Sequence, residues 1–226
     1  MFCGGHFDFE EKYMKAVIFD MDGVLVDSQP YHFKADIDTM AEYGVIKDQK
    51  FYESFAGTLT ADRMRTLKEM FGLDVPVEEM TIKRENMILD IMGKEDIKPV
   101  SGIPEFLRSI KEKGLTTAVA SSSDYKLINL ILDRLKIAKY FDSVTSGSDV
   151  KRGKPSPDVF LLAAERIGIE PAECLVVEDS ENGVKAAKAA GMKVLGYINP
   201  TSGKQDLSLA DFITDDFKKI SIDMFI

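Results

Sequence analysis

The sequence predicts an α/β fold, in which helices flank a parallel sheet and a helical segment is inserted after the first strand. Short runs of strand-forming apolar residues alternate with amphipathic helices from residue 97 onward, as in folds built from strands and helical crossovers. One further run stands near the N-terminus. The residues that follow it repeat their apolar positions at helical spacing and contain no strand candidate.

The composition is that of an ordinary globular protein, with 226 residues of which 45% are hydrophobic, enough for a packed core. The formal net charge of -9 disfavours a nucleic acid or an anionic membrane as partner, and no apolar run approaches the roughly 20 residues that span a bilayer. Cys3 and Cys174 lie far apart and lack metal-ligand spacing. We therefore expect reduced thiols and a cytoplasmic protein.

The strands are expected where continuous apolar runs suit burial on both faces of a sheet. Residues 1–14 show no clear period and are expected to form a poorly structured N-terminal extension. The first strand is AVIFD, residues 16–20. Similar runs follow at residues 115–120, 143–146, 174–179 and 193–197, with a further candidate at residues 211–214.

Four amphipathic helices are expected between these runs, at residues 104–113, 124–135, 157–167 and 180–190. Gly114, Gly168 and Gly191 follow three of them, and glycine commonly closes a helix because it adopts the left-handed conformation easily. Right-handed crossovers of this length predict a Rossmann-like parallel sheet with helices on both sides. Residues 15–29 and 97–226 make up this predicted core.

The inserted segment, residues 30–96, is predicted to be a bundle of helices. Its apolar residues form three stripes at helical spacing, namely Phe33, Ile37, Met40 and Ala41; Met64, Leu67 and Phe71; and Met80, Met87, Ile88 and Ile91. Gly44, Gly57 and the turn at 72–76 separate the stripes. Methionine fills irregular cores, so we assign the stripes to packing and not to cofactor binding.

Polar residues follow the predicted strands at the edge where open parallel sheets form their sites. Asp20 and Asp22 follow the first strand, Ser121 to Ser123 the second, and Glu178 and Asp179 the fourth. Lys154 stands in the loop after the third strand. Singly, each is more often a solvated turn residue, a helix cap or a surface lysine. Their shared position at one edge of the sheet favours a site.

These residue types suit phosphoryl transfer. A carboxylate such as Asp20 can attack phosphorus and form an aspartyl-phosphate, which splits one difficult displacement into two easier ones. Mg²⁺ would neutralise the charge, with Asp20, Asp179 and Glu178 as candidate ligands. Lys154 and the Ser121 hydroxyl can bind the phosphate. Asp22, followed by a glycine that permits a turn, can protonate the leaving oxygen.

At this point the motifs resemble a known family. DMDG at 20–23, the serine at 121, KPSPD at 154–158 and EDS at 178–180 occur in the order found in the haloacid dehalogenase superfamily, and the resemblance covers nearly everything from residue 15 onward. The segments FDMDGVLVDSQPYH, GKPSPDVF and VVEDSENGV look like its β-phosphoglucomutase and sugar-phosphatase branch. That branch carries a helical cap domain inserted just after the first motif.

The resemblance implies a role for each matching residue. Asp20 is the implied nucleophile and Asp22 the general acid and base, while Ser121 and Lys154 contact the phosphate. Asp179, Asp20 and the Asp22 carbonyl are the implied magnesium ligands, with Glu178 as a direct or outer ligand.

The predicted cap raises further candidates. Its loop at residues 56–60 is expected to contact the substrate, and we include Thr58 from this loop and Ser122 from the core among the binding residues. In related enzymes a histidine at the position of His32 lies near the leaving group, although packing alone explains a single helical histidine equally well.

The mutases that this branch contains use an arginine three residues after the loop glycine to hold a second phosphate, but this sequence has Thr60 there. Arg63, Lys83 and Arg84 are possible substitutes, yet we expect all three on a solvated face.

We therefore expect a magnesium-dependent phosphatase of a small phosphorylated metabolite, with a sugar or polyol phosphate as substrate. The alternative is a phosphosugar mutase of the β-phosphoglucomutase type. A non-catalytic binding module is disfavoured because the acid cluster is costly without metal chemistry, and a haloalkanoic dehalogenase because Asp22 suits protonation of an alcohol. The oligomeric state is undetermined by the sequence, and a monomer is compatible with it.

Overall fold

The computed structural model describes residues 14–226, so most of the predicted N-terminal extension and Cys3 lie outside the described residues. Met14, which the prediction assigns to the extension, is instead buried in the main hydrophobic cluster. Cys174 is a free, buried thiol. No helix in the part of the chain that the structure describes is long and apolar enough to cross a membrane.

The core is a parallel sheet of six strands in the order β3-β2-β1-β4-β5-β6. The strands are β1 (Ala16–Phe19), β2 (Thr116–Ser121), β3 (Ser143–Ser146), β4 (Cys174–Glu178), β5 (Lys193–Tyr197) and β6 (Phe212–Thr214). In the centre, β1 pairs with β2 and β4, so that residue 16 lies beside residues 116 and 174. The Rossmann-like α/β core predicted from the alternating pattern is therefore confirmed.

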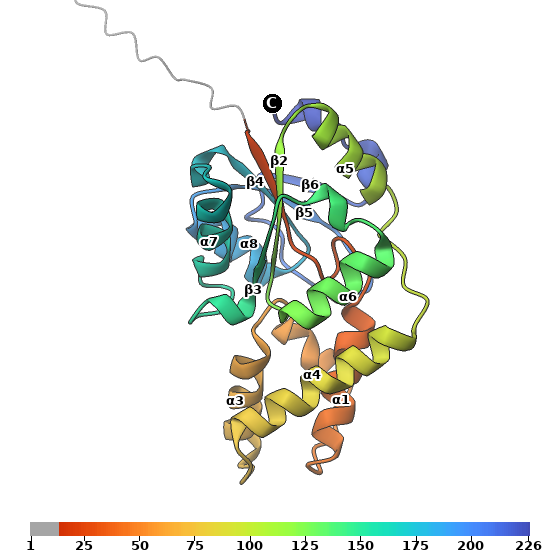
Figure 1. Cartoon of the computed structure of the whole chain (residues 1–226). Helices are drawn as coiled ribbons and strands as arrows, with labels where there is room; N and C mark the ends of the chain where they lie inside the picture. The colour runs from red at the N-terminus through yellow and green to blue at the C-terminus, as the bar shows by residue number, and fades with distance from the viewer. Residues whose placement is uncertain (1–13) are drawn as a thin grey trace, which may run out of the picture.

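Helices cover both faces of the sheet (Figure 1). On one face lie α5 (Ile103–Glu112) and α6 (Tyr125–Leu135), and on the other lie α7 (Asp158–Ile167) and α8 (Glu181–Ala189). The side chains of β1 alternate between the two resulting cores: Val17 and Phe19 pack with α5 and α6, whereas Ala16 and Ile18 pack with α7 and α8. This burial on both faces explains why the strand is a continuous apolar run.

Glycines with positive φ follow three of these four helices, as predicted, and a lysine takes this conformation after the fourth. Gly168 closes α7 with φ of 67°, in the left-handed region that glycine tolerates best. Helix α6 has no such glycine, and Lys136 adopts φ of 56° in its place. Short 3-10 turns connect the remaining elements at Ala138–Tyr140, Gly147–Asp149, Pro171–Glu173, Phe217–Lys219 and Ile222–Met224.

The inserted helices are gathered beyond the carboxyl ends of the strands (Figure 1). They are α1 (Gln29–Ala41), α2 (Gln49–Tyr52), α3 (Thr60–Phe71) and α4 (Val77–Lys94), with a 3-10 turn at Glu53–Phe55. Phe33, Met40, Met64, Leu67 and Met80 pack into a separate apolar cluster, in agreement with the packing role assigned to the stripes.

Helix α4 belongs to both halves of the molecule. Met80, near its start, packs with the other inserted helices, but Ile88 and Met92 pack into the core cluster. The third predicted stripe is thus divided between two hydrophobic cores. The domain boundary at residue 96 remains a prediction, because the apolar contacts of the core begin before it.

Candidate active site

The carboxyl ends of β1 and β4 bring three buried acids together. Carboxylate oxygens of Asp20, Glu178 and Asp179 all lie within 4.8 Å of one another. Asp20 is 6% exposed, and its backbone N–H donates to the Val177 carbonyl at 2.9 Å, which ties the end of β1 to β4. Three carboxylates at this distance and burial repel one another unless positive charge is supplied.

Lys154 supplies the first positive charge. Its side chain is fully buried, and Nζ donates to Asp20 Oδ1 at 2.6 Å and to Glu178 Oε1 at 2.7 Å. Burial alone would lower the pKa of Lys154, but the carboxylates of Asp20 and Glu178 raise it above its ordinary value. Burial raises the pKa of Asp20 to about 8 even though Lys154 opposes the shift. One lysine does not compensate the three acids.

Glu178 is held at both of its oxygens. Besides Lys154 on Oε1, Oε2 accepts hydrogen bonds from the Ser180 backbone N–H at 2.7 Å and from the Ser180 hydroxyl at 2.9 Å. A Cβ on Gly183 would lie 1.6 Å from Oε1, so only glycine lets helix α8 begin beside this carboxylate. Because both of its oxygens already accept hydrogen bonds, Glu178 is better placed to hold Lys154 and to act as an outer ligand of a metal than to coordinate the metal directly.

Asp179 has one oxygen without a partner. Its Oδ2 accepts a hydrogen bond from Ser202, while its buried Oδ1 has no hydrogen-bond partner among the described residues. Gly23, with φ of 87°, leaves the space that this carboxylate fills, since a Cβ there would lie 1.9 Å from Oδ2. A buried, unpartnered carboxylate oxygen is costly.

The residues at this position fit a divalent cation. Asp20, Asp179 and the Asp22 carbonyl offer hard oxygen donors, which Mg²⁺ prefers. The Asp22 carbonyl accepts only one weak hydrogen bond among the described residues, from Gln29 Nε2 at 3.3 Å. The acidic cluster can therefore bind a metal, and the orphaned Asp179 oxygen is the observation that points to it.

Asp22 is held by a set of donors separate from this cluster. Its Oδ1 accepts from Ser28 at 2.6 Å and lies 2.8 Å from His32 Nε2, while Oδ2 accepts from Ser123 at 2.9 Å. Burial acts to raise the pKa of Asp22, but His32 and the hydroxyl donors lower it below its ordinary value. His32 is thus not merely packed, because it contacts the second acid of the motif directly.

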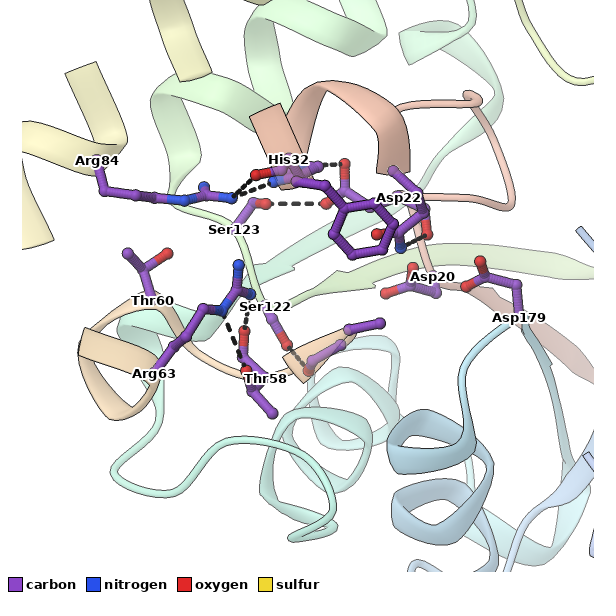
Figure 2. A pocket seen from close by; sticks show the side chains of 14 residues that line it. Asp20, Asp22, His32, Thr58, Thr60, Arg63, Arg84, Ser122, Ser123 and Asp179 are labelled. Carbon is purple, nitrogen blue, oxygen red and sulfur yellow. Dashed lines mark hydrogen bonds and ion pairs between the residues drawn. The ribbon is translucent and has the colours of Figure 1, made fainter. Parts of the chain in front are cut away.

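The cavity between the acids and the cap is shown in Figure 2, with Asp20 and Asp179 at one end and Arg63 and Arg84 at the other. It is lined by Asp20, Asp22, Gln29, His32, Phe33, Ala56, Gly57, Thr58, Thr60, Arg63, Arg84, Ser122, Ser123 and Asp179.

Among the serines predicted to bind phosphate, Ser121 does not line the cavity. It is fully buried, and its hydroxyl accepts from the Ser123 backbone N–H at 3.1 Å. Ser122, which was also predicted to bind substrate, and Ser123 line the cavity.

The predicted cap loop lies against the core. Ser122 Oγ donates to the Gly57 carbonyl at 2.7 Å, and Asn182 Nδ2 donates to the Ala56 carbonyl at 3.0 Å. Thr58 lines the cavity, but its hydroxyl proton is directed to the Phe55 carbonyl at 2.6 Å. The structure is therefore one in which the cap is closed.

The expectation that Arg63 and Arg84 are solvated is wrong. They are 7% and 2% exposed and line the cavity, because the buried carboxylate of Asp36 on α1 pairs with both guanidiniums. Lys83 does lie outside, where it pairs with Glu42. Sequence reasoning missed Asp36, and it also missed Ser28 and the contact of Ser123 with Asp22. An acid at helical spacing from His32 is the one signal that was available for Asp36.

These observations define a class of protein: a parallel α/β enzyme with a buried acid and lysine site beneath an inserted helical cap. The chain belongs to the haloacid dehalogenase-like hydrolase family, whose model matches residues 14–191. It is 35% identical over 187 residues to the phosphorylated carbohydrates phosphatase of Thermotoga maritima, covering 82% of this chain and 86% of that protein.

Two further relatives are a phosphatase and a mutase. The fructose-1-phosphate phosphatase of Escherichia coli is 32% identical, with 78% of this chain and 92% of that protein covered. The β-phosphoglucomutase of Bacillus subtilis is also 32% identical, with 81% and 83% covered. The crystal structure of β-phosphoglucomutase from Clostridium difficile superposes with a TM-score of 0.83 at 24% identity, covering 93% of this chain and 95% of that one, which shows the shared fold.

Proposed function

We propose that this enzyme is a magnesium-dependent phosphatase of a small phosphorylated metabolite, a sugar or polyol phosphate, and that it acts through an aspartyl-phosphate on Asp20. One observation carries the proposal: Asp20 lies at the floor of a capped cavity between a buried lysine and the unpartnered oxygen of Asp179. The names of the phosphatase relatives support the substrate class.

In the first step, a carboxylate oxygen of Asp20 bonds to phosphorus while the ester P–O bond breaks. Asp22 gives a proton to the leaving oxygen, so that the substrate departs as an alcohol. Ser28 and His32 donate to Oδ1 of Asp22, and Ser123 donates to Oδ2. We assign the transferred proton to Oδ2, which requires the Ser123 hydroxyl to turn so that it no longer donates to this oxygen. A bound Mg²⁺ would neutralise the charge that gathers on the phosphoryl oxygens.

In the second step, water attacks the phosphorus of the aspartyl-phosphate. Asp22, now a carboxylate, takes a proton from this water, and the bond between Asp20 and phosphorus breaks. Inorganic phosphate leaves, Asp20 is again a carboxylate, and Asp22 is again protonated. Lys154 stays bonded to Asp20 and Glu178 and keeps the nucleophile in place.

The test is a panel of sugar and polyol phosphates, with inorganic phosphate measured in the presence of Mg²⁺ and in EDTA. We expect phosphate release from at least one compound with Mg²⁺, none in EDTA, and none from Asp20→Asn under either condition. Asp38→Asn, on an exposed part of α1, is the matched control. Folded protein that releases no phosphate from any compound, or an active Asp20→Asn, would overturn the proposal.

A phosphosugar mutase is the second candidate, and the burial of Arg63 and Arg84 in the cavity favours it. Both guanidiniums lie at the end of the cavity opposite Asp20, where a second phosphate would lie (Figure 2), although each is also bonded to Asp36. Incubation with β-glucose 1-phosphate and a trace of the bisphosphate separates the two functions. Glucose 6-phosphate without free phosphate would indicate the mutase, and inorganic phosphate would indicate hydrolysis.

A further inference from the structure

Asp36 is a buried carboxylate that lies behind the cavity wall. It is fully buried and belongs to α1, yet it holds side chains from two other helices of the cap. Its Oδ2 accepts from Nη1 of Arg63 on α3 at 2.5 Å, and its Oδ1 accepts from Nε of Arg84 on α4 at 2.8 Å. A single carboxylate therefore orients both guanidiniums that face the cavity.

Arg84 passes this orientation on to His32. Its Nη2 lies 2.8 Å from His32 Nδ1 and 3.3 Å from the His32 carbonyl. A guanidinium can only donate, so Nδ1 must accept and the ring proton must sit on Nε2. That proton points at Asp22 Oδ1, 2.8 Å away. Arg84, His32 and Asp22 thus follow one another along one wall of the cavity (Figure 2).

We propose that Asp36 is a positioning residue for the acid–base step, acting on Asp22 through Arg84 and His32. Without the Asp36 carboxylate, Arg84 is free to turn away from Nδ1. The imidazole then loses the contact that selects its tautomer, and Oδ1 of Asp22 loses a fixed donor. The effect on catalysis rests on the proposed role of Asp22 as general acid and base. The effect of Asp36 on the His32 tautomer does not depend on that role.

The first experiment reads the His32 ring directly. The chain has two histidines, so ¹⁵N-histidine labelling yields two ring signatures, and His6→Gln assigns them. In the native protein we expect His32 to be the neutral ring with its proton on Nε2. In Asp36→Asn and in Arg84→Met we expect a mixture of the two tautomers. A protonated ring or an Nδ1 proton in the native protein, or an unchanged ring in both variants, would overturn the inference.

Arg63→Met is the matched control, because Arg63 shares the same carboxylate but does not touch His32. Its His32 signature should match that of the native protein. If this variant disturbs the ring as much as Arg84→Met does, the effect is general loosening of the cap and the inference is wrong. Arg84→Lys covers the case in which Asp36→Asn does not fold. It keeps the buried charge but lacks the two separate nitrogens, Nε and Nη2, with which the guanidinium reaches Asp36 and His32. We expect a mixture of His32 tautomers in this variant as well, and an unchanged ring would contradict the inference.

The second experiment compares a poor leaving group with a good one. For an alkyl phosphate, whose leaving group needs a proton on departure, we expect kcat to fall by roughly 10- to 100-fold in Asp36→Asn and Arg84→Met, by analogy with residues that orient metal-binding histidines. For p-nitrophenyl phosphate the fall should be much smaller, and Arg63→Met should affect both substrates equally. Equal losses for both substrates in Arg84→Met would contradict the inference.

The two experiments separate this inference from the proposed function. A native protein that releases phosphate from neither substrate refutes the proposed function, and the ring signature alone then decides whether Asp36 positions His32.

Discussion

At the scale of single residues, the site depends on the buried ion pairs that Lys154 forms with Asp20 and Glu178. A lysine this deeply buried is tolerated because Asp20 and Glu178 each accept a hydrogen bond from its ammonium group. The converse also holds, since the two carboxylates are tolerated partly because the lysine is there. Among the described residues Asp179 has no such partner on Oδ1, so its carboxylate is the one that a cation would stabilise most.

Replacing this lysine should destabilise the protein. Lys154→Met leaves two buried carboxylates uncompensated, and loss of one member of a buried pair costs about 3–5 kcal/mol. Urea unfolding in EDTA measures the effect. Lys185→Met, which removes an exposed helical ion pair with Glu181, should change stability by less than about 0.5 kcal/mol. Equal losses in the two variants would show that the buried pairing contributes little.

The role of Asp22 can be tested at the same scale. Asp22→Asn cannot transfer a proton, so turnover of an alkyl phosphate should fall by about 10²- to 10⁴-fold. The loss should be smaller for p-nitrophenyl phosphate, whose leaving group departs without a proton. Steady-state kinetics on both substrates provides the comparison. If both substrates lose the same factor, Asp22 is not the general acid.

At the scale of elements, the strands were predictable because their signal is local. Each of the five predicted runs, and the further candidate at 211–214, forms a strand of the sheet, with ends shifted by at most about one residue. Helix α2 was not predicted, since its four residues are too few to show a period. The end of α6 at Leu135 was predicted, but the left-handed conformation of Lys136 after it was not, because a lysine carries no glycine signal.

Two helical glycines offer a matched test of what an element can tolerate. Gly183 lies in α8, where an added Cβ would meet Glu178 Oε1 at 1.6 Å, whereas a Cβ on Gly93 in α4 would meet nothing within 4 Å. We expect Gly93→Ala to stabilise the protein by up to ~1 kcal/mol through helix propensity. Gly183→Ala should destabilise it despite the same propensity gain. Thermal melting of both variants measures this, and a stabilised Gly183→Ala would contradict the packing at Glu178.

At the scale of the whole molecule, the sheet supplies the proposed nucleophile and the acids that could bind a metal, and the inserted helices supply the far wall of the cavity. Asp20 and Asp179 come from the core, whereas His32, Arg63 and Arg84 come from the cap. The site is complete only when the two parts meet. The hydrogen bonds from Ser122 and Asn182 to the cap loop hold them in contact.

A bound metal should therefore stabilise the entire fold. Ligand at 100 times its dissociation constant adds about 2.7 kcal/mol of stability when it binds only the folded state. We expect the melting temperature to rise with Mg²⁺ and to fall back in EDTA, independently of any substrate. Asp179→Asn should lose most of this response, because it removes the charge beside the unpartnered oxygen. A response that survives in Asp179→Asn would place the metal elsewhere.

The sequence by itself determined the α/β core, the insertion after the first strand, and the motif residues from Asp20 to Asp179. These follow from short-range patterns, since the signals for a buried strand, a helix end and an acid at a strand end each lie within a few consecutive residues. Only the tertiary structure decided that Arg63 and Arg84 face inward. Their shared partner Asp36 lies 27 and 48 residues away, and an amphipathic pattern shows which face of a helix is apolar but not which charges another helix brings to it.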